Sequence, residues 1–200
     1  MHRHPMSWLG LALVILTLVF WDRSPTERPQ PSPDDERQFP NAYVDNMRTR
    51  VLDEQGRLHY RLSAQRAEHF QADPAGPGAD DYSLVDNPDL TMHLHTAEPW
   101  HLQARKGRVT DDGDVVLLHD GVRAWQNGEH GLTELTTSEL WVEVPREYAH
   151  TDKAVNMRAE QGTTDAIGLR AQLGDERIEL LSEVQGLYHP QPLQQEDADD

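Results

Sequence analysis

The chain has 200 residues, a formal net charge of −17 at pH 7, 36% hydrophobic residues and no cysteine. The charge excludes nucleic acid as a partner, because neutralising phosphates requires clustered lysines and arginines. The lack of cysteine excludes a lipid-modified N-terminus and a thiol nucleophile, and the length suits one domain with short additions.

Residues 1–23 are predicted to form a short tail and one transmembrane helix. Residues 6–21 carry no charge, and a helix of that length spans about 24 Å, slightly less than a ~30 Å hydrocarbon core. Trp8 and Trp21 stand near its ends, where aromatic residues favour the membrane interface. The alternative is a cleaved secretory signal, but residues 19–23 are too bulky for a cleavage site, so we expect a retained anchor.

Two polar segments flank the remaining domain. Residues 24–39 contain four prolines and few apolar side chains, a composition that predicts an extended tether. Residues 191–200 are mostly polar or acidic and are predicted to be a disordered tail. The folded domain is therefore expected at residues 40–190.

Residues 40–190 are predicted to be all-β, because apolar and polar side chains alternate over many short stretches. Residues 46–51 and 58–64 alternate in this way, and residues 53–56 between them have the composition of a turn, which predicts a hairpin. Many short strands with turns between them predict a sandwich, a barrel or a jelly roll. Further strands are expected at residues 90–95, 100–104, 115–118, 121–125, 136–144, 154–158, 168–173, 178–181 and 184–188.

The apolar side chains of these strands occupy alternate positions, so they lie on one face of each strand, which predicts a common apolar interior. For any single residue an ordinary core position is the simpler interpretation. For the whole set, the question is whether the interior closes or stays open. The set comprises Met47, Thr49, Val51, Leu58, Tyr60, Leu62, Leu90, Met92, Trp100, Leu102, Leu140, Val142, Leu169, Ala171, Ile178 and Leu180.

Two closely spaced histidines are the only pattern that suggests a metal site. His93 and His95 would share one face of a strand, as the ligands of cupin-type metalloenzymes do. Glu98 follows them too closely for the usual cupin spacing, and the simpler interpretation is a polar strand face. We therefore expect no metal, no cofactor and no catalytic residue, and keep a membrane-anchored metalloenzyme as a third hypothesis.

A series of motifs in a fixed order resembles the LptC family of lipopolysaccharide export proteins. The resemblance covers about residues 40–190 and the N-terminal helix. It implies an open β-jelly roll in the periplasm, on a single-pass inner-membrane anchor. The helix is preceded by Arg3 and followed by three arginines, and under the positive-inside rule this count favours a cytoplasmic C-terminal domain. The periplasmic location is therefore implied by the resemblance alone. The motifs are residues 53–62, Asn87-Pro88, residues 100–107, 118–122, 135–137, 168–171 and 178–184.

The family implies a relay without catalysis. The domain would receive lipopolysaccharide from the permease subunits of an inner-membrane ABC transporter, which it contacts through its N-terminal edge and its transmembrane helix. It would pass the lipid through its C-terminal edge to a soluble periplasmic jelly-roll protein similar to LptA. An adaptor that docks by its edges without carrying lipid is the alternative function.

The resemblance also assigns candidate residues by position. The family's lipid contacts fall on Met47, Val85, Ile178 and Tyr188, and the inward apolar positions Thr49, Val51, Tyr60, Met92, Leu102, Leu140 and Leu180 extend this lipid-binding set. The edges that dock partners fall on residues 41–51 and 178–188. Candidate edge residues are Asn46, Met47, Arg48, Gly56, Gly162, Glu183 and Val184; for the two glycines a turn with positive φ is the simpler interpretation.

Overall fold

The computed structural model describes residues 39–73, 76, 78–94, 98–110, 113–128 and 131–188. The chain divides into two units, Met1–Gln38 and Phe39–Asp200, and all described residues belong to the second. The predicted transmembrane helix, nearly all of the predicted tether and the predicted tail lie outside the described residues. Among the described residues, no helix is long and apolar enough to cross a membrane.

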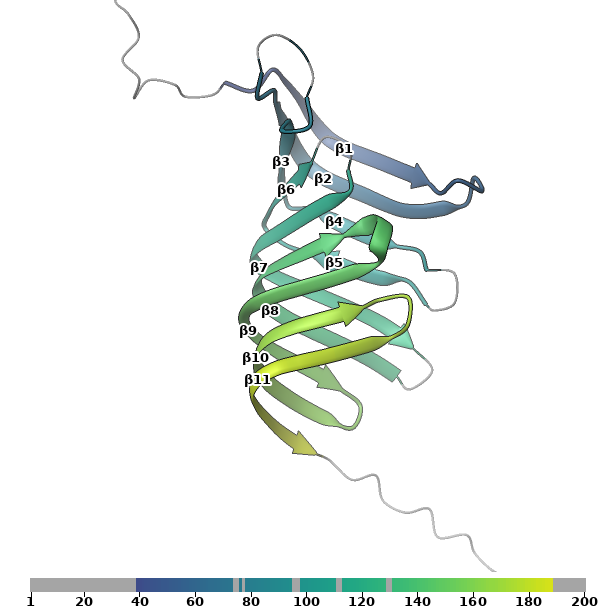
Figure 1. Cartoon of the computed structure of the whole chain (residues 1–200), viewed down its shortest axis with the longest axis vertical. Coiled ribbons are helices and arrows are strands. Elements are labelled where there is room, and N and C mark those ends of the chain that lie inside the picture. The colour runs from purple at the N-terminus through teal and green to yellow at the C-terminus, as the bar shows by residue number, and fades with distance from the viewer. Residues whose placement is uncertain are drawn as a thin grey trace, which may run out of the picture. The chain divides into compact units, whose positions relative to one another are not determined.

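Within these ranges the chain forms one antiparallel sheet of eleven strands (Figure 1). The prediction of an all-β fold is confirmed, but the prediction of short strands is wrong for most of the sheet, since β2, β7 and β8 have 13, 14 and 13 residues. A 3-10 turn, η2, occupies Val144–Arg146. The strands are β1 Ala42–Leu52, β2 Leu58–Phe70, β3 Tyr82–Asp86, β4 Asp89–Met92, β5 Trp100–Gln103, β6 Lys106–Thr110, β7 Val115–Gly128, β8 Gly131–Glu143, β9 Tyr148–Ala159, β10 Gly162–Gln172 and β11 Arg177–Tyr188.

The sheet consists of two walls that share their long strands. The strand order is β11-β10-β9-β8-β7-β5-β4-β2-β3-β6, with β1 paired to β2 and β6 also paired to β7. The short strands β3 and β6 pair with one half of β2 and of β7, and we call this side wall 1. The short strands β4 and β5 pair with the other halves and form wall 2. In both walls β1 and β11 are the end strands.

A crease separates the two walls, and residues with left-handed backbone lie along it, most of them at bulges. The register shifts between His119 and Val122 in β7 and between Asp165 and Ile167 in β10. A bulge bends a strand and increases its twist, and glycine, asparagine and aspartate tolerate the required positive φ best. Because the long strands bend along one line, the sheet folds over on itself (Figure 1). The residues on this line are Asn46 (φ 54°), Asp120 (65°), Gly121 (86°), Gly168 (82°) and Glu183 (49°).

The hydrophobic core lies between the walls. Leu90 and Met92 of wall 2 and Val116 and Val142 of wall 1 have no exposed surface. Burial of each such side chain contributes about 1.5–3 kcal/mol to the hydrophobic free energy of folding. Small side chains let the walls approach closely; the buried alanines are Ala64, Ala67, Ala124, Ala149, Ala166 and Ala171.

Candidate functional site: an apolar interior uncovered at its two ends

The middle of the interior is filled by the protein's own side chains. The cavity between the walls there is about 20 Å³, which is room for about one water molecule. Trp100, Leu102 and Ala124 line it from wall 2, and Leu140 and Leu169 line it from wall 1. In this conformation the middle therefore has no room for a fatty acyl chain.

We call the side of the folded sheet opposite the crease the mouth. Among the described residues, two polar contacts bridge it. The Tyr60 hydroxyl of wall 2 donates to the carbonyl oxygen of Gly113, in the loop between β6 and β7, at 3.4 Å. The Gln126 side-chain amide of wall 2 donates to a carboxylate oxygen of Glu176, in the turn between β10 and β11, also at 3.4 Å. Both contacts are near the upper limit for a hydrogen bond, so each holds the walls together only weakly.

The β1 end of the interior is partly uncovered. Met47, Thr49 and Val51 stand opposite Ala64, Leu62 and Tyr60 of β2. Cross-strand partners share a face of the sheet, so all three point inward. Met47 and Val51 are half-buried against the core, and Thr49 is exposed. Within the described part of the chain, β1 pairs with β2 alone, so its other edge carries no strand.

The β11 end is uncovered to a greater extent. Ile178 and Leu180 stand opposite Ala171 and Leu169 and are half-buried. Beyond the crease every residue of β11 is exposed, with Val184 at 53% and Tyr188 at 69%. A hollow of about 300 Å³ lies there; residues lining it include Met157, Ala159, Gly162, Gly186 and Tyr188. This end offers apolar surface and free volume together.

The predicted lipid-binding residues belong to one apolar interior but differ in burial; Ile178 of β11 lines the same small cavity as Leu102 and Leu140. Tyr60, Val85, Met92, Leu102 and Leu140 are buried in the filled middle. The others belong to the end strands: Met47, Thr49 and Val51 to β1, and Ile178, Leu180 and Tyr188 to β11.

The candidate edge residues are placed as follows. Asn46, Met47 and Arg48 lie on β1, and Glu183 and Val184 lie on β11 at the crease. Gly162 is not on a free edge, because it begins β10 and pairs with both β9 and β11. A Cβ atom on Gly162 would lie 2.1 Å from the carbonyl oxygen of Leu187, so this position needs glycine for backbone packing. Gly56, with φ 77°, lies in the turn of the β1–β2 hairpin.

The structure describes only part of the histidine pattern. The strand predicted over residues 90–95 ends at Met92, so His93 follows it; His95 lies outside the described residues. Among the residues that the structure describes, no three His, Cys, Asp or Glu side chains are placed to hold a metal ion. Burial, then the nearby Arg61 and His101, lower the pKa of His93 below its ordinary value.

The mouth contacts were not anticipated from the sequence. Gln126 lies on the inward parity of β7, two residues after Ala124, and is 5% exposed. A polar residue among the inward-facing apolar positions of a strand indicates that its side chain has a buried polar partner, so this position could have been found from the sequence. Gly113 carried no such signal, because its partner Tyr60 is distant in sequence and lies in the opposite wall.

Comparison with known proteins gives a match to one protein family and to a solved structure. The chain matches the family described as "Lipopolysaccharide-assembly, LptC-related" over residues 9–189. Among solved structures it is similar to that of LptH, the LptA homologous periplasmic component of the lipopolysaccharide transport device from Pseudomonas aeruginosa. The identity is 11%, the TM-score is 0.49, and the match covers 66% of this chain and 95% of that one. No curated protein matches the sequence.

Proposed function

Since the chain belongs to the LptC-related family of lipopolysaccharide assembly, we propose that it is a lipopolysaccharide-binding relay of the cell envelope. It receives the lipid from an inner-membrane ABC transporter at the β1 end. It releases the lipid at the β11 end to a soluble periplasmic partner, on the way to the outer membrane. Residues 6–21 anchor it in the inner membrane, with residues 39–188 in the periplasm.

The need for such a relay follows from the cost of exposing acyl chains to water. Each exposed methylene costs about 0.8 kcal/mol, so about ten methylenes cost roughly 8 kcal/mol. An apolar surface beside the chain removes most of that cost. The sugars and phosphates stay in water and need no cover, so an acidic protein exterior is compatible with this role.

One observation carries the proposal: the inward apolar face continues through both end strands and is left uncovered there. Met47 and Val51 at one end and Ile178 and Leu180 at the other pack on the same core. A protein that only needed a core would gain stability by covering these positions. Since the middle is filled, we infer that the walls separate about the crease when an acyl chain passes, which breaks the two weak mouth contacts.

Photo-crosslinking along the interior tests the relay. A photoreactive side chain is placed at Met47, at Leu102 or at Ile178 in the full chain, expressed with the transporter. Arg48 and Glu179, which are exposed neighbours on the outer face of the same end strands, serve as controls. We expect lipopolysaccharide adducts at the inward positions and not at the controls. Adducts at the two ends without Leu102 would rule out passage through the middle.

The adaptor function predicts a different pattern in the same experiment. An adaptor gives protein adducts from the edges of β1 and β11 and no lipid adduct at any position. The filled middle is the observation in its favour, because a closed interior needs no lipid to be stable. A lipid adduct at any inward position therefore contradicts the adaptor, and the adduct at Leu102 tests passage through the middle.

A further inference from the structure

The outer face of wall 2 carries a strip of arginines at the β1 end. Arg48 and Arg50 are exposed on β1, and Arg61 is exposed on β2. Arg50 stands directly opposite Arg61, and Arg48 stands opposite Ser63. Met47, Thr49 and Val51 alternate with these arginines along β1 and point inward, so the arginines point outward. We call Arg48, Arg50 and Arg61 the arginine strip.

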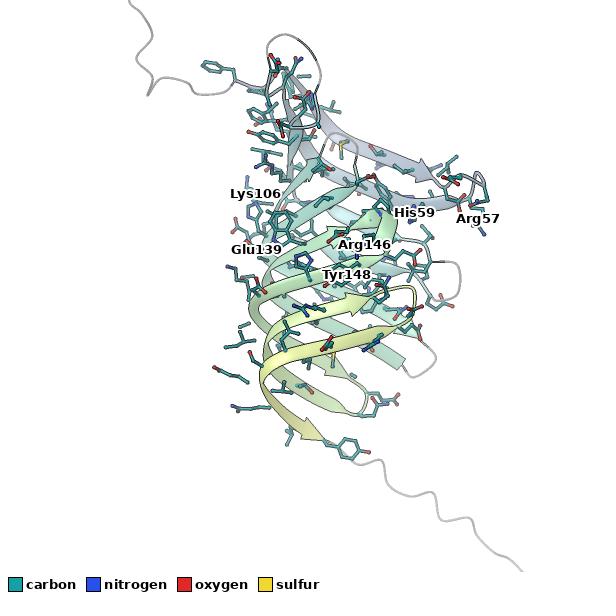
Figure 2. The ribbon with its side chains drawn as sticks, viewed as in Figure 1. Arg57, His59, Lys106, Glu139, Arg146 and Tyr148 are labelled. Carbon is teal, nitrogen blue, oxygen red and sulfur yellow. The ribbon has the colours of Figure 1, made fainter. Side chains whose placement is uncertain are left out.

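No described acidic side chain neutralises the arginine strip. In the described ranges, no carboxylate forms an ion pair with any of the three guanidinium groups. On the same hairpin, by contrast, Arg57 (Figure 2) pairs with Asp53 at 2.8 Å and Arg66 pairs with Glu68 at 2.9 Å. Like charges directly opposite on a sheet destabilise it. A chain with 35 acidic residues could readily supply a counter-charge here, so the uncompensated charge points to an external anion.

The strip stands beside an open strand edge. A strand added along the free edge of β1 would place alternate side chains next to Arg48 and Arg50, whose Cα atoms are about 6.8 Å apart along a strand. Its other side chains would extend the inward row formed by Met47, Thr49 and Val51. Such a strand would meet cations on one face and an apolar row on the other.

We propose that the arginine strip recognises a β-strand of another protein that carries two acidic side chains at alternate positions, with apolar residues between them. This inference rests on the proposed docking of the transporter at the β1 edge and defines the chemistry of the docked strand. The acidic residues pair with Arg48 and Arg50 on the outer face, while the hydrogen bonds of the added strand are made by the backbone of β1.

A second copy of this chain fits the strip poorly. Counting along wall 2, where neighbouring strands are antiparallel, β1 and β11 run in the same direction. The half of β11 that belongs to wall 2 presents Gln185 and Leu187 outward, opposite Asp165 and Thr163. Neither residue supplies a carboxylate to Arg48 or Arg50, so the strand that fits belongs to a different protein.

A lipid phosphate also fits the strip poorly. Acyl chains in contact with Met47 or Val51 lie on the inner face of wall 2, and the strip lies on the outer face, across the sheet. The phosphates of that lipid would emerge at the mouth or at the end of the interior. The strip is therefore assigned to protein recognition.

Co-purification with the transporter tests the strip. The full chain is expressed with the permease subunits, solubilised in mild detergent and captured at a series of salt concentrations. Arg48→Gln/Arg50→Gln is compared with Lys153→Gln/Arg170→Gln, which removes two exposed cations elsewhere. Because exposed ion pairs are individually weak, we expect the first variant to retain about fivefold less permease at ~0.15 M salt and to lose most of the salt dependence. The control variant should match the wild type.

A photoreactive side chain at Thr49 separates this inference from the proposed function. In the wild type we expect an adduct with a permease subunit. If the adduct persists and the Arg48→Gln/Arg50→Gln variant retains the permease fully, the strip has no role, although docking at β1 stands. If Thr49 gives no protein adduct at all, docking itself fails. An adduct with a second copy of this chain would also overturn the inference.

Two further measurements complete the test. Mapping the adduct identifies the partner strand, and replacing its acidic residue by lysine together with Arg50→Glu should restore capture. Binding of lipopolysaccharide to the detergent-solubilised full chain is also measured without the transporter. If Arg48→Gln/Arg50→Gln weakens this binding, the anion is a lipid phosphate and the assignment to a protein strand is wrong.

Discussion

Tyr60 and Gly113 meet across the mouth of the folded sheet, where the tyrosine hydroxyl donates to the glycine carbonyl oxygen at 3.4 Å. The two residues come from opposite walls, so their separation reports directly on whether the interior is open. Gln126 and Glu176 make the second contact of this kind. Opening of the mouth can therefore be followed by experiment, through the separation of these two residue pairs.

Fixing the mouth closed should prevent lipid binding. The chain has no cysteine, so Gln126→Cys/Glu176→Cys can be joined by a short bifunctional thiol reagent without side reactions at other sites. If passage requires the walls to separate, the joined protein should bind lipopolysaccharide more than about tenfold less tightly, because the competent conformation is depleted. The unjoined double variant and each single variant treated with the reagent are the controls. Equal binding by the joined protein would show that lipid does not need the mouth.

Ile178→Asp should abolish lipid transfer. Ile178 is half-buried on the inward face of β11, and a carboxylate there would meet the acyl chain at its exit. The loss of apolar contact should also cost about 1–3 kcal/mol of unfolding free energy. Transfer is measured in a reconstituted assay, and unfolding is measured by urea titration of the same preparation. Glu179→Ala, on the outward face of the same strand, should transfer normally; transfer by Ile178→Asp at the wild-type rate would contradict the proposed exit.

Gly162→Ala should loosen β11 from β10. Its φ is 153°, and an added Cβ would meet the Leu187 carbonyl at 2.1 Å. Strained backbone of this kind costs about 1–3 kcal/mol, so the unfolding midpoint in urea should fall. Amide hydrogen exchange of residues 184–188 should accelerate. In Gly186→Ala, an added Cβ meets its nearest neighbour, the Thr164 hydroxyl, at 3.4 Å, so stability should stay within about 0.5 kcal/mol of the wild type.

The titration of His93 should report on the arginine strip. Burial lowers the pKa of His93 first, and the positive charges of Arg61 and His101 lower it further. Arg61→Gln should therefore raise this pKa but leave it below the ordinary value, as followed by NMR of the imidazole protons. Arg170→Gln should leave it unchanged. A pKa that does not respond to Arg61→Gln would mean that the strip's charge is screened at His93.

The same shift predicts the sign of a pH effect on stability. A histidine whose pKa is lowered by folding is protonated more readily in the unfolded chain. Its contribution to stability is therefore fully present above the unfolded value of about 6.5. It is lost as the pH falls through the lowered value of the folded state. His93→Gln should reduce this part of the pH dependence between pH 7 and 5.

The two strands predicted at residues 115–118 and 121–125 are halves of one strand, β7, and those predicted at 178–181 and 184–188 are halves of β11. In each case a bulge with positive φ interrupts the alternation of period two. The alternation located both halves correctly. It could not show that they join at a crease, because a bulge and a turn have similar local composition.

The sequence by itself determined the β-class and the identity of most inward residues, because alternation along a strand is a local property that the pleat converts directly into two faces. Whether that interior is hollow or filled was decided only by the tertiary structure. Closure depends on how near the two walls approach, and the contacts that set this distance, such as Tyr60 with Gly113 and Gln126 with Glu176, join residues about 50 positions apart. The placement of Arg50 directly opposite Arg61 likewise arises from register, since it is the pairing of β1 with β2 that brings the two arginines together.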